Sequence, residues 1–131
     1  IPEQQRVKCK SCKKLVRAYR TVAVDFCPEV LIIPFKRFGG MGALTSFVQS
    51  SITYPDELDV ASYSSSSTGI YKLVAVIFHQ GMIDNKKYSC ACLDQKTGQW
   101  IYISKDKSLI VDSSGAHSGD ALVLFYQKSS R

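Results

Sequence analysis

The sequence predicts a mainly β domain made of antiparallel sheets, and three observations lead to that fold class. Short runs rich in β-branched and aromatic residues recur along the chain, bounded by Gly, Pro, Asp and Ser. Two of the later runs are separated by Lys96-Thr97-Gly98, which is typical of a hairpin turn. No stretch has the apolar period of a helix longer than about two turns. With 131 residues, 45% of them hydrophobic, the chain is long enough to bury one core.

The expected strands follow from these runs in chain order. They are 22–26, 30–38, 46–54, 70–79, 88–93, 99–104, 109–111 and 121–126. Pro34 lacks an N–H group, so the run that contains it should lie at a sheet edge or at a bulge. A turn is expected at 56–59 and a polar loop at 62–69. The closing run should share one antiparallel sheet with residues 73–78, with Trp100 and Phe125 in the core.

Charge and cysteine content limit the function classes. The net charge is +6, and residues 1–20 hold seven Lys or Arg against Glu3 alone. Such a segment suits nucleic acid, an acidic protein surface, or simply a solvated strand face. Five cysteines, an odd number, exclude a complete disulfide framework. Without an apolar run of membrane length or a signal peptide, we expect an intracellular protein, cytoplasmic or nuclear. Because the chain opens without Met, we also expect a piece of something longer.

Five motifs occur in one order along nearly the whole chain. They are Cys9-Lys10-Ser11-Cys12; the run 28–38, which ends in Lys36-Arg37-Phe38; Tyr54-Pro55 followed by Leu58-Asp59; the run 71–81, which contains His79-Gln80-Gly81; and Trp100 with the closing Leu124-Phe125-Tyr126. Together they resemble the ubiquitin-specific cysteine proteases. The resemblance implies the mainly β part of an α+β papain-like fold, with antiparallel palm and fingers sheets. Residues 1–131 would be the C-terminal half of that domain, without the helical thumb that carries the nucleophilic cysteine.

The residues that the resemblance places at the catalytic positions cannot perform the reaction. A thiol protease needs a general base and a group that orients it. The family's histidine position falls on Lys87, and its orienting acid positions fall on Ser104 and Lys105. A lysine is protonated near neutral pH and cannot accept the thiol proton. Asp106 is one residue late, and on a strand it would point to the other face. The sequence therefore predicts a pseudoenzyme.

Cys9 and Cys12 form half of a candidate zinc site. Two cysteines two residues apart in a tight turn can present both sulfurs to one tetrahedral ion. In the family a second pair lies upstream, so zinc is expected only with ligands from a segment outside this sequence. The alternative is a turn with free thiols.

Other reactive side chains have structural interpretations. We expect His79 to be a strand-end residue whose ring nitrogens are satisfied by hydrogen bonds, and His117 to lie on the surface. Cys90 and Cys92 share one side of a strand, and we expect them to face the interior as small hydrophobes. Cys27 is expected at an apolar spacer position.

Three functions remain open from the sequence. The first is an inactive module that binds protein partners, with ubiquitin as one candidate, through Met82, Ile83 and Tyr88 in and beside a short loop. The second is an active deubiquitinase whose cysteine lies upstream and whose base is His79 or His117. The third is nucleic-acid binding by the basic N-terminal segment. No membrane association is expected.

Overall fold

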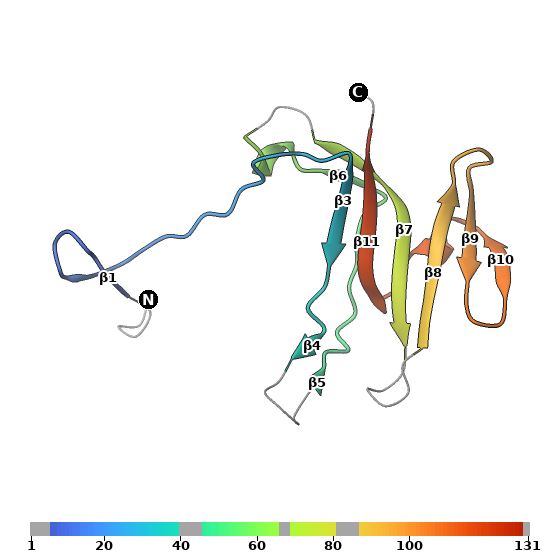
Figure 1. The fold of residues 1–131 in the computed structure, drawn as a ribbon, viewed down its shortest axis with the longest axis horizontal. Coiled ribbons are helices and arrows are strands. Elements are labelled where there is room, and N and C mark those ends of the chain that lie inside the picture. Colours follow the sequence, from blue (N-terminus) through green and yellow to red (C-terminus); the bar gives the residue numbers. More distant parts are fainter. Residues whose placement is uncertain (1–5, 40–45, 66–68, 81–86, 130–131) are drawn as a thin grey trace.

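The computed structural model describes residues 6–39, 46–65, 69–80 and 87–129. One antiparallel sheet dominates them, in the order β10-β9-β8-β7-β11-β3, with β6 beside the first part of β7 (Figure 1). Its strands are β3 (Val30–Pro34), β6 (Glu57–Asp59), β7 (Ile70–Gln80), β8 (Lys87–Asp94), β9 (Gln99–Ile103), β10 (Ser108–Val111) and β11 (Ala121–Lys128).

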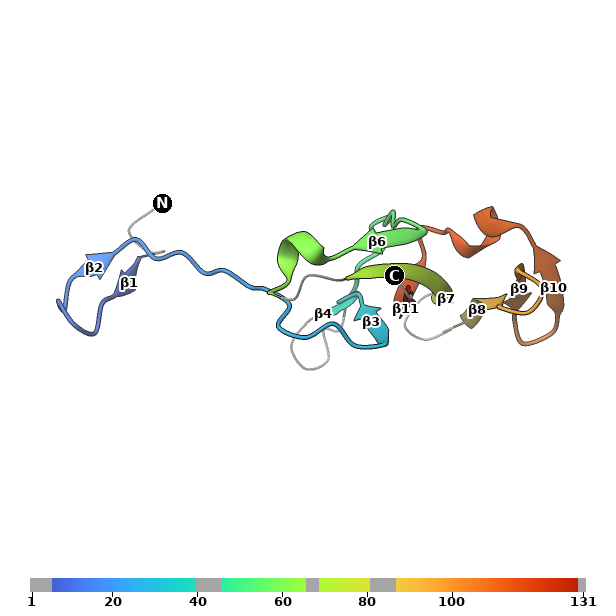
Figure 2. The same cartoon turned by 90° about the horizontal axis from the view of Figure 1, so that it is seen from above.

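Two small hairpins and two single turns of 3-10 helix complete the described chain. The hairpins are β1 (Val7–Lys8) with β2 (Leu15–Val16), and β4 (Phe38–Gly39) with β5 (Ser46–Phe47). The 3-10 turns are η2 (Ala61–Tyr63) and η3 (Ser113–Ala116). The β1–β2 hairpin stands away from the main sheet at the end of an extended segment, as Figures 1 and 2 show from two directions. No helix in the described part has the length or apolar character of a membrane span.

The core lies on one face of the main sheet. Its centre is the long strand β7, where Val76 is fully buried and pairs with the equally buried Ala91 of β8. Other buried members come from neighbouring strands and loops: Cys27, Val60, Tyr71, Leu73, Phe78, Trp100, Ala116, Ala121, Leu124 and Tyr126. Burial of this apolar area is the main term that stabilises the sheet.

Tyrosine hydroxyls attach the connecting segments to this core. Tyr71 donates to the carbonyl oxygen of Pro28 at 2.6 Å, and Tyr126 donates to that of Pro55 at 2.7 Å. Both rings are at most 1% exposed, so each buried hydroxyl needs its partner. The two segments that contain these prolines are thereby fixed over the core face.

Much of the predicted strand pattern is confirmed. The run 70–79 is β7, and the β8–β9 hairpin closes at Gly98, whose φ of +73° favours glycine. β11 pairs with β7 as expected, and Trp100 is buried. Pro34 ends β3 at the sheet edge, where its missing N–H is tolerated.

Other expectations about the strands were wrong. The run 22–26 is not a strand and makes only an isolated bridge between Val24 and Ser64. Residues 57–59 form β6 instead of a turn. The run 30–38 divides into β3 and β4, and only the first residues of 46–54 form a strand.

The expected orientations of Phe125, Cys90 and Cys92 were also wrong. Leu124 and Tyr126 face the core, whereas Phe125 is half-buried and is not part of it. In β8 the residue that faces the core is Ala91, so both cysteines lie half-buried on the opposite face. Cys27, by contrast, is buried in the core as expected.

Candidate functional site

The three positions that the sequence predicts to be degenerate, Lys87, Ser104 and Lys105, lie at one end of the main sheet, where β8 begins and β9 ends. Lys87 is the first residue of β8 and pairs with Gln80, the last residue of β7. Ser104 directly follows β9, and its N–H donates to the carbonyl oxygen of Lys107 at 2.9 Å to close the turn to β10. Since Cys90 pairs with Ile103, the start of β8 and the end of β9 lie at the same edge.

This end of the sheet carries positive charge, and the nearest described imidazole along the strands, His79, pairs with Tyr88 beside Lys87. Lys87 and Lys105 are exposed, and Ser104 is half-buried. Asp106 is exposed in the turn and makes no hydrogen bond or ion pair within the described residues. Because it lies in a turn, the argument from strand alternation does not apply to it. What it lacks instead is a neighbouring base to orient.

His79 is enclosed by aromatic rings. Its side chain is 1% exposed, and neither ring nitrogen has a hydrogen-bond partner in the described structure. The rings of Phe38, Phe47 and Tyr88 lie around it at centroid distances of 5.4, 4.6 and 5.1 Å. The buried strand-end position of His79 is confirmed, but the expectation that its ring nitrogens are satisfied was wrong among the described residues.

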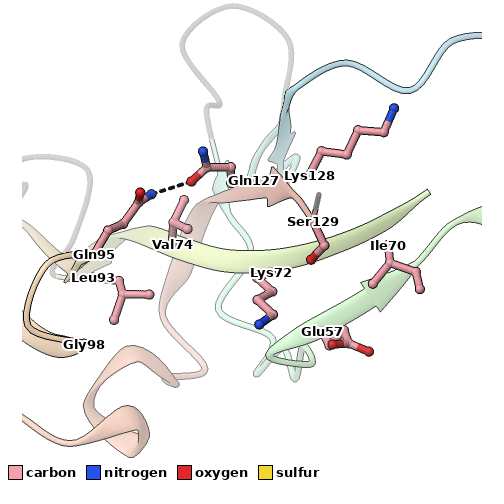
Figure 3. Close-up of a pocket in the computed structure, with 10 residues that line it drawn as sticks. All are labelled: Glu57, Ile70, Lys72, Val74, Leu93, Gln95, Gly98, Gln127, Lys128 and Ser129. Carbon is pink, nitrogen blue, oxygen red and sulfur yellow. Dashed lines mark hydrogen bonds between the residues drawn. The ribbon is translucent and has the colours of Figure 1, made fainter. Parts of the chain in front are cut away.

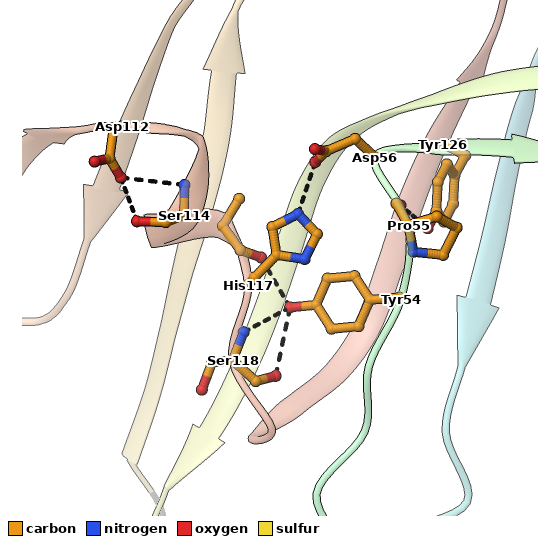
Figure 4. A network of polar contacts seen from close by, with 9 residues as sticks. Tyr54, Pro55, Asp56, Asp112, Ser114, His117, Ser118 and Tyr126 are labelled. Carbon is orange, nitrogen blue, oxygen red and sulfur yellow. Dashed lines mark hydrogen bonds and ion pairs between the residues drawn. The ribbon is translucent and has the colours of Figure 1, made fainter.

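His117 has a carboxylate partner, which the sequence did not predict. Its Nε2 lies 2.6 Å from a carboxylate oxygen of Asp56, and its ring stacks on Tyr54 at 4.9 Å (Figure 4). The side chain is 33% exposed, so it is only partly a surface residue. Burial raises the pKa of the Tyr54 hydroxyl, which donates to the carbonyl oxygen of Ala116 at 2.8 Å. The backbone N–H of Ser118 donates to the same hydroxyl at 3.0 Å.

A cavity of about 200 Å³ adjoins this His–Asp pair. It is lined by Ser51, Ile52, Thr53, Tyr54, His117, Ser118 and Gly119. No cysteine is among these lining residues of the described chain. Its observed contacts join the segment of Tyr54 to the end of η3.

A larger cavity of about 540 Å³ lies where β7 changes its neighbour from β6 to β8 (Figure 3). Its polar lining includes Lys72, Glu57 and the hydrogen-bonded pair Gln95 and Gln127. Ile70, Val74 and Leu93 supply its apolar wall. The strand β7 begins at this cavity, with Ile70 in its lining, and ends at Gln80, which pairs with Lys87. The cavity is therefore separate from the positions of Lys87 and Ser104.

Cys9 and Cys12 occupy the turn of the β1–β2 hairpin. The N–H of Cys9 donates to the carbonyl oxygen of Lys14 at 2.9 Å, and Lys13 has a positive φ of 63° that tightens the turn. Hydrogen bonds from the backbone of Cys12 and then Ser11 hold the pKa of the Cys9 thiol below its ordinary value. A sulfur stabilised as thiolate suits a soft metal ion. No cluster of three or more potential ligands occurs within the described residues.

Arg37 is the important residue whose role the sequence left unassigned. It is 2% exposed and donates hydrogen bonds to backbone carbonyl oxygens of four residues: Val48, Ser50, Gly119 and Ala121. Its position in Lys36-Arg37-Phe38 was the only signal in the sequence. Of the candidate binding residues, Met82 and Ile83 lie outside the described residues, and Tyr88 is 51% exposed.

Comparison with known sequences matches nearly the whole chain. The pattern of the family described as ubiquitin carboxyl-terminal hydrolase covers residues 2–126. The mouse ubiquitin carboxyl-terminal hydrolase 17-like protein E is 30% identical over 121 residues, which are 90% of this chain and 22% of the relative. Human ubiquitin carboxyl-terminal hydrolase 2 is 26% identical over 129 residues, 96% of this chain and 21% of the relative. The chain thus spans about a fifth of the length of these curated relatives.

Solved structures show the same arrangement of strands. A chain of a SAGA Ubp8/Sgf11/Sus1/Sgf73 DUB module matches with a TM-score of 0.81 at 22% identity, over 95% of this chain and 29% of that one. A form of the module bound to monoubiquitin matches with a TM-score of 0.78 at 22% identity and the same coverage. At this identity the likeness shows the fold alone. It confirms the expected mainly β part of an α+β cysteine-protease fold.

Proposed function

This chain belongs to the ubiquitin carboxyl-terminal hydrolase family, and we propose that it serves there as a protein-binding module without peptidase activity. The observation that carries the proposal lies at the end of the main sheet where β8 begins and β9 ends. Lys87, Ser104 and Lys105 lie together there. None of these side chains can take the proton of a thiol and return it to a leaving amine at neutral pH.

The local charge strengthens this argument. Two exposed lysines at one edge disfavour a nearby cation, so a histidinium formed during catalysis would be opposed where the family needs it. An adjacent lysine can lower the pKa of a thiol, but it cannot replace the proton transfer. The exposed lysines at this end of the sheet therefore suit the binding of an anionic or polar partner surface better than they suit catalysis of hydrolysis.

The alternative of an active enzyme needs another base, and neither described histidine suits it. His79 is enclosed by Phe38, Phe47 and Tyr88. His117 has the geometry of an oriented base because it pairs with Asp56. However, it lies after η3 and beside Tyr54, whereas the resemblance places the family's histidine at Lys87, the first residue of β8. The nucleic-acid alternative rests on the charge of residues 6–20 alone.

We propose that zinc is a structural ion when this chain stands in a protein as long as its curated relatives. Cys9 and Cys12 would be two of its ligands, and two further ligands would come from a segment outside this sequence. Metal analysis of the longer protein should find zinc, and a Cys9→Ser, Cys12→Ser variant should lose it. A Cys90→Ser, Cys92→Ser variant is the matched control and should retain the metal. Equal zinc in both variants would contradict the assignment.

A ubiquitin that carries a C-terminal electrophile tests the absence of peptidase activity. An active member of the family supplies an activated thiolate that reacts covalently with such a probe. We expect the longer protein to remain unlabelled under conditions in which an active family member is fully labelled, as seen by the shift of the band on a denaturing gel. Labelling of a single cysteine that disappears in a His117→Ala variant would favour the active-enzyme alternative instead.

A further inference from the structure

The strand β10 is an open edge of the main sheet. The strand order begins with β10 and ends with β3, and β10 pairs only with β9 in the described structure (Figure 1). The register is regular, with Ser108 opposite Ile103 and Ile110 opposite Ile101. The backbone groups on its outer side are therefore available for another strand.

The hairpin turn shows which groups these are. The hydrogen bond from the N–H of Ser104 to the carbonyl oxygen of Lys107 makes these two residues a hydrogen-bonded pair. Hydrogen-bonded and non-hydrogen-bonded pairs alternate along an antiparallel ladder. Leu109 therefore directs its N–H and C=O toward β9, whereas Ser108 and Ile110 direct theirs outward. No hydrogen bond of the described chain engages the outward groups.

Three of the protections that usually block pairing at an edge are missing from β10, although the strand itself is short. Natural edge strands often carry a charge, a proline or a bulge. The four residues of β10 contain none of these, and Leu109 and Ile110 are 48% and 69% exposed. Apolar side chains are thus presented on both sides of a row of free backbone groups.

We propose that β10 is a docking edge for an extended segment of a partner protein, which adds to the sheet as a further strand. The segment would carry apolar residues beside Leu109 and Ile110 and acidic residues beside the turn that holds the exposed Lys105 and Lys107. Backbone hydrogen bonds would supply affinity, and the side chains at alternate positions would supply selectivity. The turn shares Lys105 with the degenerate catalytic positions, whereas the strand contacts of Ser108, Leu109 and Ile110 need neither those positions nor ubiquitin.

Charge favours such a partner over a second copy of this chain. Two copies, each with a net charge of +6, repel one another. The antiparallel register that would pair Ser108 with Ile110 of a second copy also brings the turn of Asp106 beside Asp112, which directly follows β10. Like charges close together oppose this association.

A synthetic peptide provides the test. The probe is a fluorescein-labelled peptide in which valine and threonine alternate after two glutamates, titrated into the full chain by fluorescence anisotropy. We expect binding with a dissociation constant below about 1 mM. An Ile110→Pro variant should bind at least about tenfold more weakly, because it loses one outward N–H and presents a ring to the incoming strand. An Ile110→Thr variant keeps the N–H and should bind like the unmodified chain.

Two controls keep the result decisive. Since the N–H of Ile110 faces away from β9, the proline variant should retain the sheet, which circular dichroism checks. A peptide N-methylated at alternate residues tests the unmodified protein directly and should also lose binding. The proposal is overturned if the probe does not bind, or if the N-methylated peptide binds as well as the probe. It is also overturned if a concentration-dependent dimer forms through β10, seen by sedimentation and abolished by Ile110→Pro.

Discussion

Replacement of Arg37 by methionine is expected to destabilise the domain by about 3 to 5 kcal/mol, because a buried charged network would lose its only donor group. The guanidinium Nε donates to the carbonyl oxygen of Ala121 at 2.8 Å, and Nη1 donates to those of Val48 and Ser50 at 3.0 and 2.8 Å. Nη2 donates to the carbonyl oxygen of Gly119. Methionine fills similar space but leaves these acceptors without a donor.

Arg37 joins parts of the chain that lie far apart in sequence. It connects the segment after β3 with the segment after β5 and with the start of β11, 84 residues away. Its guanidinium also lies 6.0 Å from the ring centroid of Phe47. Lysine cannot replace it, since a single ammonium group does not reproduce the fork of donors. Arg37→Lys should therefore lose most of the same stability.

Urea unfolding followed by fluorescence of the single Trp100 gives the measurement. The matched control is Lys36→Met, which changes the exposed neighbour and should alter the free energy of unfolding by less than about 0.5 kcal/mol. A loss below about 1 kcal/mol for Arg37→Met would show that the network does not hold these segments.

Restoring the catalytic positions is expected to create activity in the longer protein, provided that it supplies a cysteine nucleophile. The Lys87→His, Ser104→Asp double variant places an imidazole and a carboxylate at the edge where β8 begins and β9 ends. General acid–base catalysis contributes about a hundred- to ten-thousand-fold, so hydrolysis of a fluorogenic ubiquitin substrate should rise by about a hundredfold.

The control for this variant removes charge without adding a base. Lys87→Gln with Ser104→Asn has similar shape and no titrating group, and its rate should equal that of the unmodified protein. An equal gain in both double variants would mean that loss of the lysine charge, not gain of a base, is responsible. The proposal that activity is lost because Lys87 and Ser104 replace a base and its orienting acid would then be wrong.

The sequence predicted strands well where alternation and β-branched content agreed, as in β7 and the β8–β9 hairpin. It failed where only one signal was present. The run 22–26 has the composition of a strand, but Val22 and Phe26 are 77% and 76% exposed, so the structure gives it no sheet to join. β6 was missed because Asp56, Glu57 and Asp59 are typical of turns, although Leu58 packs against the core.

The face of Phe125 could not be predicted for a geometric reason. The pairing of β11 with β7 shifts register between Ala121 and Val123 and again between Phe125 and Tyr126. The first irregularity adds Leu122 to β11 and changes the phase of its alternation, so counting by twos from the buried Ala121 gives the wrong face for Phe125. The second adds Val74 to β7 and leaves β11 in phase. Sequence alone does not show where such bulges lie.

Site residues from one motif were easier to predict than contacts between motifs. Lys87 and Ser104 lie at the same end of the sheet because β8 and β9 form a single hairpin. His117 and Asp56, by contrast, are 61 residues apart and meet only because Tyr54 and η3 pack over the same face. The acceptors of Arg37 are backbone oxygens, which leave no trace in side-chain identity.

Hydrolysis of a ubiquitin conjugate by the unmodified longer protein tests the central claim most directly. If Lys87, Ser104 and Lys105 stand at the catalytic positions, as we propose, the rate should not exceed that of a variant whose candidate cysteine nucleophile is replaced by alanine. Steady turnover that requires that cysteine and is abolished by His117→Ala, with the fold intact by circular dichroism, would contradict the account and make this chain part of an active peptidase.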